Sequence, residues 1–193
     1  NKQFPLGITE TEIYKGLDQK SFVYLTFRGD ASWSEKELIK FKTFTNAFKI
    51  KLREVLREEM GGTYGVWVPS SFSKYPKSMY QFRVIFGCDP NSVDALSDAL
   101  FEQISLVKVN GLDDIYLSKA KEMQKNEFDK NLRDNKYWLE QLKSMYFNNS
   151  SNYMLSNYNN LVDNVVVEDL KVLANKYLNM ENYVKVVLYP EQN

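Results

Sequence analysis

The sequence predicts an α+β fold of two layers, in which helices pack on one face of a mostly antiparallel sheet. The expected order is strand, helix, two strands, two or three helices and a closing strand. Two strands in direct succession favour this arrangement over a doubly wound parallel sheet, which needs stricter alternation of strands and helices. The 193 residues fit one domain of ordinary size, and an apolar fraction of 44% supports a packed core.

The first sixteen residues mix Pro5, Gly7 and Gly16 with polar residues, a composition typical of a linker. Because the chain begins at Asn1 without an initiator methionine, we expect it to be processed or cut from a longer protein. Residues 1–16 are therefore predicted to be a linker from a preceding domain, and residues 17–193 a single domain.

The first predicted strand, Ser21–Arg28, is β-branched and aromatic and is expected to be buried on both faces. Ser34, followed three residues later by Glu37, is a capping pattern that opens a helix. Gly61-Gly62 ends this helix, because glycine adopts the left-handed conformation without steric cost. The apolar residues of the helix recur at steps of three and four: Leu38, Phe41, Phe48, Leu52, Val55 and Leu56.

Two further strands, Thr63–Val68 and Met79–Gly87, are joined by the connection Pro69–Ser78, which is long enough to be mobile. Asp89-Pro90 then supplies a cap and a first-turn proline for a helix that ends at Asn110-Gly111.

The rest of the chain is predicted to be mainly helical. One helical pattern runs from Asp113 to Tyr146, and an asparagine-rich segment at residues 148–164 is expected to be a polar loop. A short helix, Glu168–Tyr177, and a strand, Tyr183–Tyr189, close the chain. The side chains of the long helix that are expected to face inward are Ile115, Ala120, Met123, Phe128, Leu132, Leu139, Leu142 and Met145.

Composition and charge exclude several classes of function. Lysine and arginine number 25, aspartate and glutamate also 25, so the zero net charge argues against a nucleic-acid binder. Aromatic residues make up 15% of the chain, and core packing is favoured over base or sugar stacking for most of them. The longest apolar runs are too short for a membrane span.

The chain has no histidine, which excludes a Ser-His-Asp triad, a Cys-His dyad and a histidine-ligated metal site. The single cysteine, Cys88, ends a predicted strand. A small buried residue is the favoured interpretation of Cys88 over a reactive thiolate.

The segment from Leu56 to Val66 carries the candidate functional residues. Arg57 lies on the last helical turn, two glycines turn the chain, and Tyr64 opens the next strand. A guanidinium can donate to peptide carbonyls, and a phenol can donate to a carbonyl oxygen that gains negative charge. From the spacing alone, a structural role is favoured, in which Arg57 caps the helix carbonyls and Tyr64 packs under a helix.

The run Arg57-Glu58-Glu59-Met60-Gly61-Gly62-Thr63-Tyr64-Gly65-Val66, between a long amphipathic helix and a strand pair, resembles the pitrilysin/insulinase family of zinc metallopeptidases. More narrowly, it resembles their C-terminal homologous domain, and the likeness covers nearly the whole chain. This resemblance implies an α+β sandwich and a protease whose two halves close around a peptide. Zinc and the general base come from the N-terminal half, through an inverted His-x-x-Glu-His motif.

The resemblance also implies roles for two residues. Tyr64 would contact the scissile carbonyl oxygen as the catalytic residue of this chain, and Arg57 would bind the substrate backbone together with Tyr64. No metal ligand is expected in this chain, and the connection Pro69–Ser78 is expected to border the chamber. The isolated chain is therefore expected to be inactive.

The partners implied are a zinc-bearing N-terminal half, on the same chain or on a partner subunit, and a peptide substrate. The resemblance favours a bacterial protein in the periplasm or cell envelope. Two alternatives remain open: a non-metal subunit that pairs with a metal-bearing chain, and a scaffold or assembly subunit without a catalytic contribution.

Overall fold

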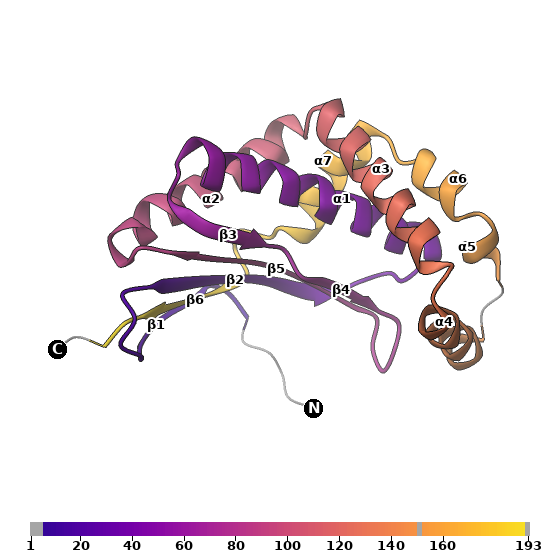
Figure 1. Ribbon diagram of the computed structural model, residues 1–193, viewed down its shortest axis with the longest axis horizontal. Helices are drawn as coiled ribbons and strands as arrows, with labels where there is room; N and C mark the ends of the chain where they lie inside the picture. Colours follow the sequence, from indigo (N-terminus) through magenta and orange to yellow (C-terminus); the bar gives the residue numbers. More distant parts are fainter. Residues whose placement is uncertain (1–5, 150–151, 192–193) are drawn as a thin grey trace.

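The computed structural model describes residues 6–149 and 152–191 and has two layers (Figure 1). A six-stranded sheet forms one layer, and the helices cover one of its faces. The strand order is β1-β6-β2-β5-β3, with β4 also paired to β5. β1 pairs with β6 in parallel, and the other pairs are antiparallel. The two-layer α+β prediction is confirmed.

The strands are β1 (Thr9–Tyr14), β2 (Ser21–Asp30), β3 (Thr63–Trp67), β4 (Ser70–Ser73), β5 (Met79–Cys88) and β6 (Tyr183–Tyr189). The α-helices are α1 (Glu35–Arg53), α2 (Val93–Asn110), α3 (Asp114–Asn131), α4 (Asn135–Asn148), α5 (Tyr153–Ser156), α6 (Tyr158–Asp163) and α7 (Val167–Tyr177). A π-helical turn, η1 (Glu54–Glu59), extends α1, and a 3₁₀ turn, η2 (Pro90–Ser92), precedes α2.

The core lies between α1 and the central strands β2 and β5. Phe44 and Phe48 of α1 stack with ring centroids 5.8 Å apart, and both rings also contact Phe82 of β5. Leu25 and Phe27 of β2 are fully buried in the same layer. Alternate residues of a strand point to the same face, so these large side chains all meet the helices.

β2 is buried on one face only, whereas the sequence predicted burial on both. Val23 and Leu25 are buried, but Tyr24 between them is 37% exposed. The reason is topological, because the helices that cover the sheet lie on the same side of it (Figure 1). A strand rich in apolar residues does not reveal whether one or both of its faces are covered.

The N-terminal segment differs from its prediction as a linker. Residues 9–14 form β1, which adds to the edge of β6 in parallel register from Thr9↔Val184 to Tyr14↔Tyr189. The rings of Tyr14 and Tyr189 stack at 5.4 Å. Residues 1–5 lie outside the described part of the chain, and the domain boundary at residue 16 stays a prediction.

The connection predicted over residues 69–78 contains β4, which pairs with β5 from Ser70↔Phe82 to Ser73↔Met79. The asparagine-rich segment at 148–164, predicted to be a loop, contains α5 and α6. These elements are too short for a periodic pattern to separate them from loops.

The long helix predicted from Asp113 to Tyr146 is two helices. The first, α3, ends at Asn131 with Leu132 as its cap residue, and the Asp134 side chain caps α4 by accepting from Lys136 N at 2.9 Å. The apolar periodicity of α3 continues into that of α4 without an interruption in the sequence. The pattern alone therefore predicted one helix where the structure has two.

The side chains expected to face inward along this stretch fall into two groups. Ala120 and Phe128 are buried, and Leu132 and Met145 are partly buried. Four others are exposed, two on the outer side of α3 and two on α4, which lies beside the helix layer rather than within it (Figure 1): Ile115, Met123, Leu139 and Leu142.

A carboxylate joins α1 to α7. Ser34 Oγ caps α1 by accepting from Glu37 N at 3.1 Å, as predicted. The Glu37 side chain accepts from Tyr177 Oη at 2.5 Å and from Lys176 Nζ at 2.6 Å. Burial by itself would raise the pKa of Glu37, but hydrogen bonds from Lys176 and Tyr177 lower it below its usual value.

We expect Glu37→Gln to reduce the free energy of unfolding by about 1–3 kcal/mol near pH 7, because charge-assisted hydrogen bonds to α7 are weakened. The lowered pKa of Glu37 contributes stability above its unfolded value of about 4.3, and this contribution is lost as the pH falls through the folded pKa. Urea denaturation at several pH values should therefore show the difference from wild type shrinking in acid.

Glu35→Gln is the matched control, because Glu35 shares the first turn of α1. An equal effect of both substitutions would assign the loss to the helix dipole rather than to the link with α7.

Candidate functional site

The helix that carries Arg57 changes its hydrogen-bonding pattern before it ends. In η1, Met60 N donates to Val55 O at 3.1 Å, which is the i→i+5 bond of a π-helix. Arg57 lies in this last turn and is exposed. Within residues 6–149 and 152–191, Arg57 makes no hydrogen bond or ion pair, so it does not cap the helix carbonyls.

Contacts from α3 and from the last turn of α1 hold this π-turn. Tyr116 Oη donates to Glu54 Oε1 at 2.5 Å, and Lys51 Nζ lies 3.6 Å from the same oxygen. Burial, followed by the hydrogen bond to Glu54, raises the pKa of Tyr116, so the phenol stays a donor near neutral pH. π-turns are rare and are frequent at functional sites, so the position of Arg57 as well as its exposure fits a ligand-binding residue.

Tyr64 lies in a β-bulge at the start of β3. Thr63 pairs with Cys88 and the next pair is Gly65 with Gly87, so Tyr64 has no partner residue on β5. A bulge bends its strand and re-aims a side chain, and bulges are frequent beside active sites. Gly61, at φ +61°, turns the chain between η1 and this strand, as the sequence predicted.

The Thr63 hydroxyl holds the bulge together. Thr63 Oγ1 donates to Gly87 O at 2.7 Å across the strand pair, and Gly65 N donates to Thr63 Oγ1 at 3.1 Å. These bonds occupy polar groups that the irregular ladder would otherwise leave without partners.

The bulge presents the Tyr64 ring to solvent, with 59% of the residue exposed. Lys20 Nζ lies 5.9 Å from the ring centroid, within the range of a cation–π contact. Tyr64 therefore does not pack under a helix, and the structural interpretation of the Arg57–Tyr64 spacing is not supported. Both residues are exposed at the same end of β3, on the turn and strand that follow α1.

Trp67 is a further exposed aromatic residue near the site that the sequence did not single out. It lies on β3 with Tyr64, is 50% exposed, and its ring covers Gly65, where a Cβ would come within 3.2 Å of the indole. Core packing, the interpretation favoured for most aromatic residues, does not apply to Trp67. Glycines inside two predicted strands, Gly65 and Gly87, were the available signal, since they often mark a bulge or a close approach.

The arrangement offers hydrogen-bond donors and no metal centre. Among the described residues, no group of three Cys, Asp, Glu or His side chains is placed to hold a metal ion, and the sequence contains no histidine. The donor set therefore does not fit catalytic zinc.

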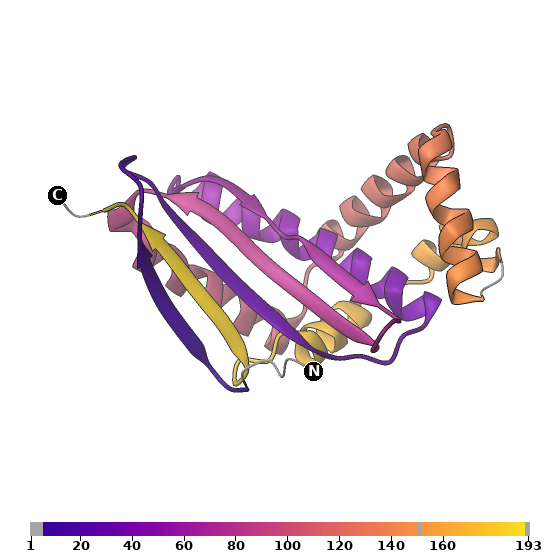
Figure 2. The same cartoon turned by 90° about the horizontal axis from the view of Figure 1, so that it is seen from below.

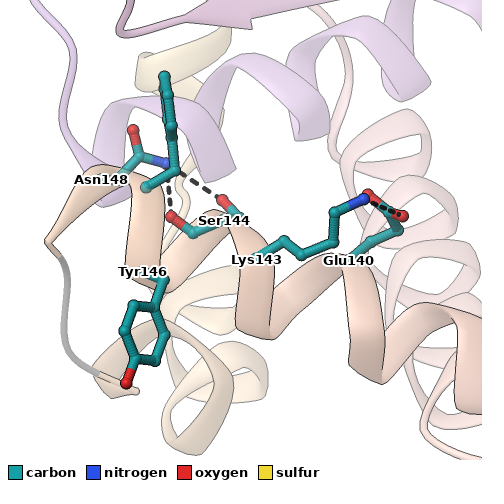
Figure 3. A pocket seen from close by; sticks show the side chains of 6 residues that line it. Glu140, Lys143, Ser144, Tyr146 and Asn148 are labelled. Carbon is teal, nitrogen blue, oxygen red and sulfur yellow. Dashed lines mark hydrogen bonds and ion pairs between the residues drawn. The ribbon is translucent and has the colours of Figure 1, made fainter.

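A pocket on α4 is separate from this site. Its lining residues are Glu140, Lys143, Ser144, Tyr146, Phe147 and Asn148 (Figure 3). Its polar groups bind one another, with Lys143 Nζ 3.0 Å from Glu140 Oε1 and Asn148 Nδ2 donating to Ser144 O at 2.9 Å. α4 lies at the far end of the molecule from β3 in both views (Figures 1 and 2).

Comparison with known proteins identifies a family and a shared fold. The family model described as "Peptidase M16 inactive domain" matches residues 2–124, and a model of a domain of unknown function matches residues 116–188. No curated protein sequence matches significantly.

Solved protease structures share the fold. The ferredoxin protease FusC, in complex with Arabidopsis ferredoxin, is 18% identical with a TM-score of 0.80, over 97% of this chain and 21% of that one. The periplasmic protease PqqL from Escherichia coli is 18% identical with a TM-score of 0.80, over 96% of this chain and 21% of that one. A peptidase M16 inactive domain from Pseudomonas fluorescens is 19% identical with a TM-score of 0.78, over 100% of this chain and 46% of that one.

The two-layer fold is the one that these protease structures share. The chain belongs to the peptidase M16 inactive-domain family, since that model matches more than half of it. It spans about one fifth of the length of FusC and PqqL. Within the described ranges, no helix is long and apolar enough to cross a membrane.

We expect Thr63→Val to lower the free energy of unfolding by about 1–3 kcal/mol, because it leaves Gly87 O and Gly65 N without their partner. Thr63→Ser, which keeps the hydroxyl, should lose much less. Hydrogen exchange of the Gly65 amide should accelerate in the valine variant. Thr26→Val is the control on β2, since the Thr26 hydroxyl makes no hydrogen bond within the described residues. An equal loss there would contradict the role of the bulge.

Cys88 is fully buried, and burial together with the nearby Asp89 carboxylate raises the pKa of its thiol to about 11. Because the thiolate is the reactive form, we expect the folded chain to react with a disulfide reagent near pH 8 about 100-fold more slowly than the urea-unfolded chain. Cys88 is the single cysteine of the sequence, so the absorbance change reports on it alone. Rapid labelling of the folded chain would refute its assignment as a core residue.

Proposed function

We propose that this chain is the C-terminal substrate-binding domain of a zinc-dependent metalloendopeptidase that degrades peptides in a closed two-half chamber. Family membership supports a protease context, and the short span relative to FusC and PqqL supports a larger parent protein. The observation that carries the proposal is the bulge that presents Tyr64 to solvent while Thr63 holds the backbone in place.

The proposed division of labour follows from the side chains present. Tyr64 donates a hydrogen bond to the scissile carbonyl oxygen as negative charge develops on it, which stabilises the tetrahedral intermediate. Arg57 binds backbone carbonyls of the substrate with its fixed fork of donors. Zinc and the general base come from the N-terminal half or from a partner subunit, because this chain has neither histidine nor a described metal-binding group.

A divided site explains why Tyr64 and Arg57 are exposed here. Catalytic groups on separate halves align only when the chamber closes, and closure also excludes water from the reaction. On this proposal the isolated chain hydrolyses nothing. PqqL is a periplasmic protease, which supports a periplasmic or cell-envelope location for the parent protein.

An alternative proposal is a non-catalytic partner subunit or an assembly scaffold of the same family. The description of the matching family as an inactive domain favours it. The two proposals differ in the role of Tyr64. In the first proposal its exposed phenol contacts the substrate, and in the second it has no catalytic role.

We expect Tyr64→Phe in the parent protease, or in the complex with its zinc-bearing partner, to lower kcat by about 100-fold, as loss of one oxyanion donor does. Peptide hydrolysis, zinc content and thermal unfolding are measured together. Tyr146→Phe is the matched control, because Tyr146 is 92% exposed on the distant α4. An unchanged kcat for Tyr64→Phe, with zinc and folding intact, would favour the scaffold.

A further inference from the structure

The π-turn that carries Arg57 is anchored at its first residue, Glu54. The N–H of Glu54 donates to both Ile50 O and Lys51 O, which marks the point where α1 gives way to the π-turn. The Glu54 carboxylate accepts from Tyr116 Oη of α3 at 2.5 Å. Tyr116 is 5% exposed and belongs to the core, so α3 holds its phenol in a fixed position. α3 therefore binds the helix at the residue where the hydrogen-bonding pattern changes.

A lysine joins this group of side chains. Lys51 Nζ lies 3.6 Å from Glu54 Oε1 and 5.4 Å from the centroid of the Tyr116 ring. Burial by itself would lower the pKa of Lys51, but the hydrogen bond to Tyr116 and two neighbouring carboxylates raise it. These carboxylates belong to Glu54 and Glu59, the first and last residues of the π-turn. The cation of Lys51 therefore attracts both ends of the turn.

The π-turn determines which side chains face solvent at the end of the helix. In a regular α-helix, residues seven apart share a face, so Glu59 would lie on the side of the fully buried Leu52. The i→i+5 bond from Met60 N to Val55 O adds one residue to the turn and rotates the following residues by about 100°. Glu59 is accordingly exposed. Arg57 lies inside this turn, so its direction depends on the same extra residue.

The Arg57 side chain has no polar contact of its own that would fix it. Within residues 6–149 and 152–191 it makes no hydrogen bond or ion pair, and all residues from Arg57 to Met60 are exposed. The chain is held again at Gly62, where a Cβ would come within 3.0 Å of the buried Leu96 side chain. Arg57 therefore lies on a short segment between two anchored points, Glu54 and Gly62.

We propose that Tyr116 and Glu54 are positioning residues for Arg57. Their hydrogen bond holds the start of the π-turn against α3, and the turn holds the guanidinium at the end of β3 that carries Tyr64. The inference rests on the proposed substrate-binding role of Arg57 and adds the residues that position it. A binding group that is held in place beforehand loses less conformational freedom when the ligand arrives, so the ligand binds more tightly.

The test compares Arg57→Ala with Tyr116→Phe in the parent protease, or in the complex with its zinc-bearing partner. Arg57→Ala should raise KM about tenfold with little change in kcat, because it removes a contact made equally before and during the reaction. Tyr116→Phe keeps the buried ring and removes only the phenol oxygen, and it should raise KM about threefold by loosening the turn. Rates of peptide hydrolysis over a range of substrate concentrations give kcat and KM separately.

The double variant distinguishes positioning from a general loss of stability. If Tyr116 acts through Arg57, Tyr116→Phe should not raise KM further in a protein that already carries Arg57→Ala. An equal rise of KM in both backgrounds would show that Tyr116 acts elsewhere, and would overturn the inference.

Glu54 provides a second test through a conservative substitution. Glu54→Gln keeps an oxygen that can accept from Tyr116 Oη and Glu54→Ala does not, so only the alanine variant should raise KM. The Met60 amide, whose bond to Val55 O closes the π-turn, reports on the turn directly. Its hydrogen exchange should accelerate in Tyr116→Phe and Glu54→Ala and stay slow in Glu54→Gln. Unchanged exchange of this amide in Tyr116→Phe would also overturn the inference.

Tyr183→Phe is the matched control, because Tyr183 Oη also donates to a carboxylate, Glu10 Oε1, at 2.7 Å. Tyr183 lies on β6, which β2 and β5 separate from β3, and its substitution should leave KM unchanged. Arg57→Ala with the wild-type KM would overturn the proposed role of Arg57 and the inference together. A raised KM in Arg57→Ala, with Tyr116→Phe no different from the Tyr183 control, would overturn the inference alone.

Discussion

The packing of α1 across β2 and β5 is the contact on which the other elements depend. Phe44, Phe48 and Phe82 form one aromatic cluster, and Leu25 and Phe27 are fully buried beside it. α3 and α7 pack on α1, and a carboxylate near the start of α1 binds α7. Since these helices are held on one side, none of the described helices lies on the opposite face of the sheet.

The two irregular pieces of backbone lie close together at the end of α1. The π-turn of η1 and the bulge at Tyr64 both give up regular hydrogen bonds, and each is compensated by side chains. Tyr116 of α3 binds Glu54 in the π-turn, and the Thr63 hydroxyl binds across the bulge to the neighbouring strand. Such departures from regular geometry persist where the surroundings stabilise them, and here they present two exposed side chains, Arg57 and Tyr64.

Arg57 and Tyr64 offer hydrogen-bond donors and one positive charge at the candidate site. The sequence contains no histidine, and the described residues contain no metal-binding group.

Local patterns in the sequence predicted much of the fold and the position of the candidate site. The cap at Ser34, the glycine turn at Gly61 and the closing strand Tyr183–Tyr189 all follow from interactions within a few residues. The segment from Arg57 to Tyr64 is also recognisable in the sequence, because its residue types and spacing are local features. The bulge at Tyr64 and the π-turn were not predictable in this way, since they depend on the register between β3 and β5 and on contacts with α3.

Long periodic patterns in the sequence were enough to place most helices and strands, and the lack of histidine excluded a histidine-ligated metal site in this chain. Long-range contacts decided the rest. Strand β1 carries few apolar residues and is ordered by pairing with β6, about 175 residues away in the chain. Which face of the sheet the described helices cover was settled by the fold as a whole, because it depends on the side to which each connection returns.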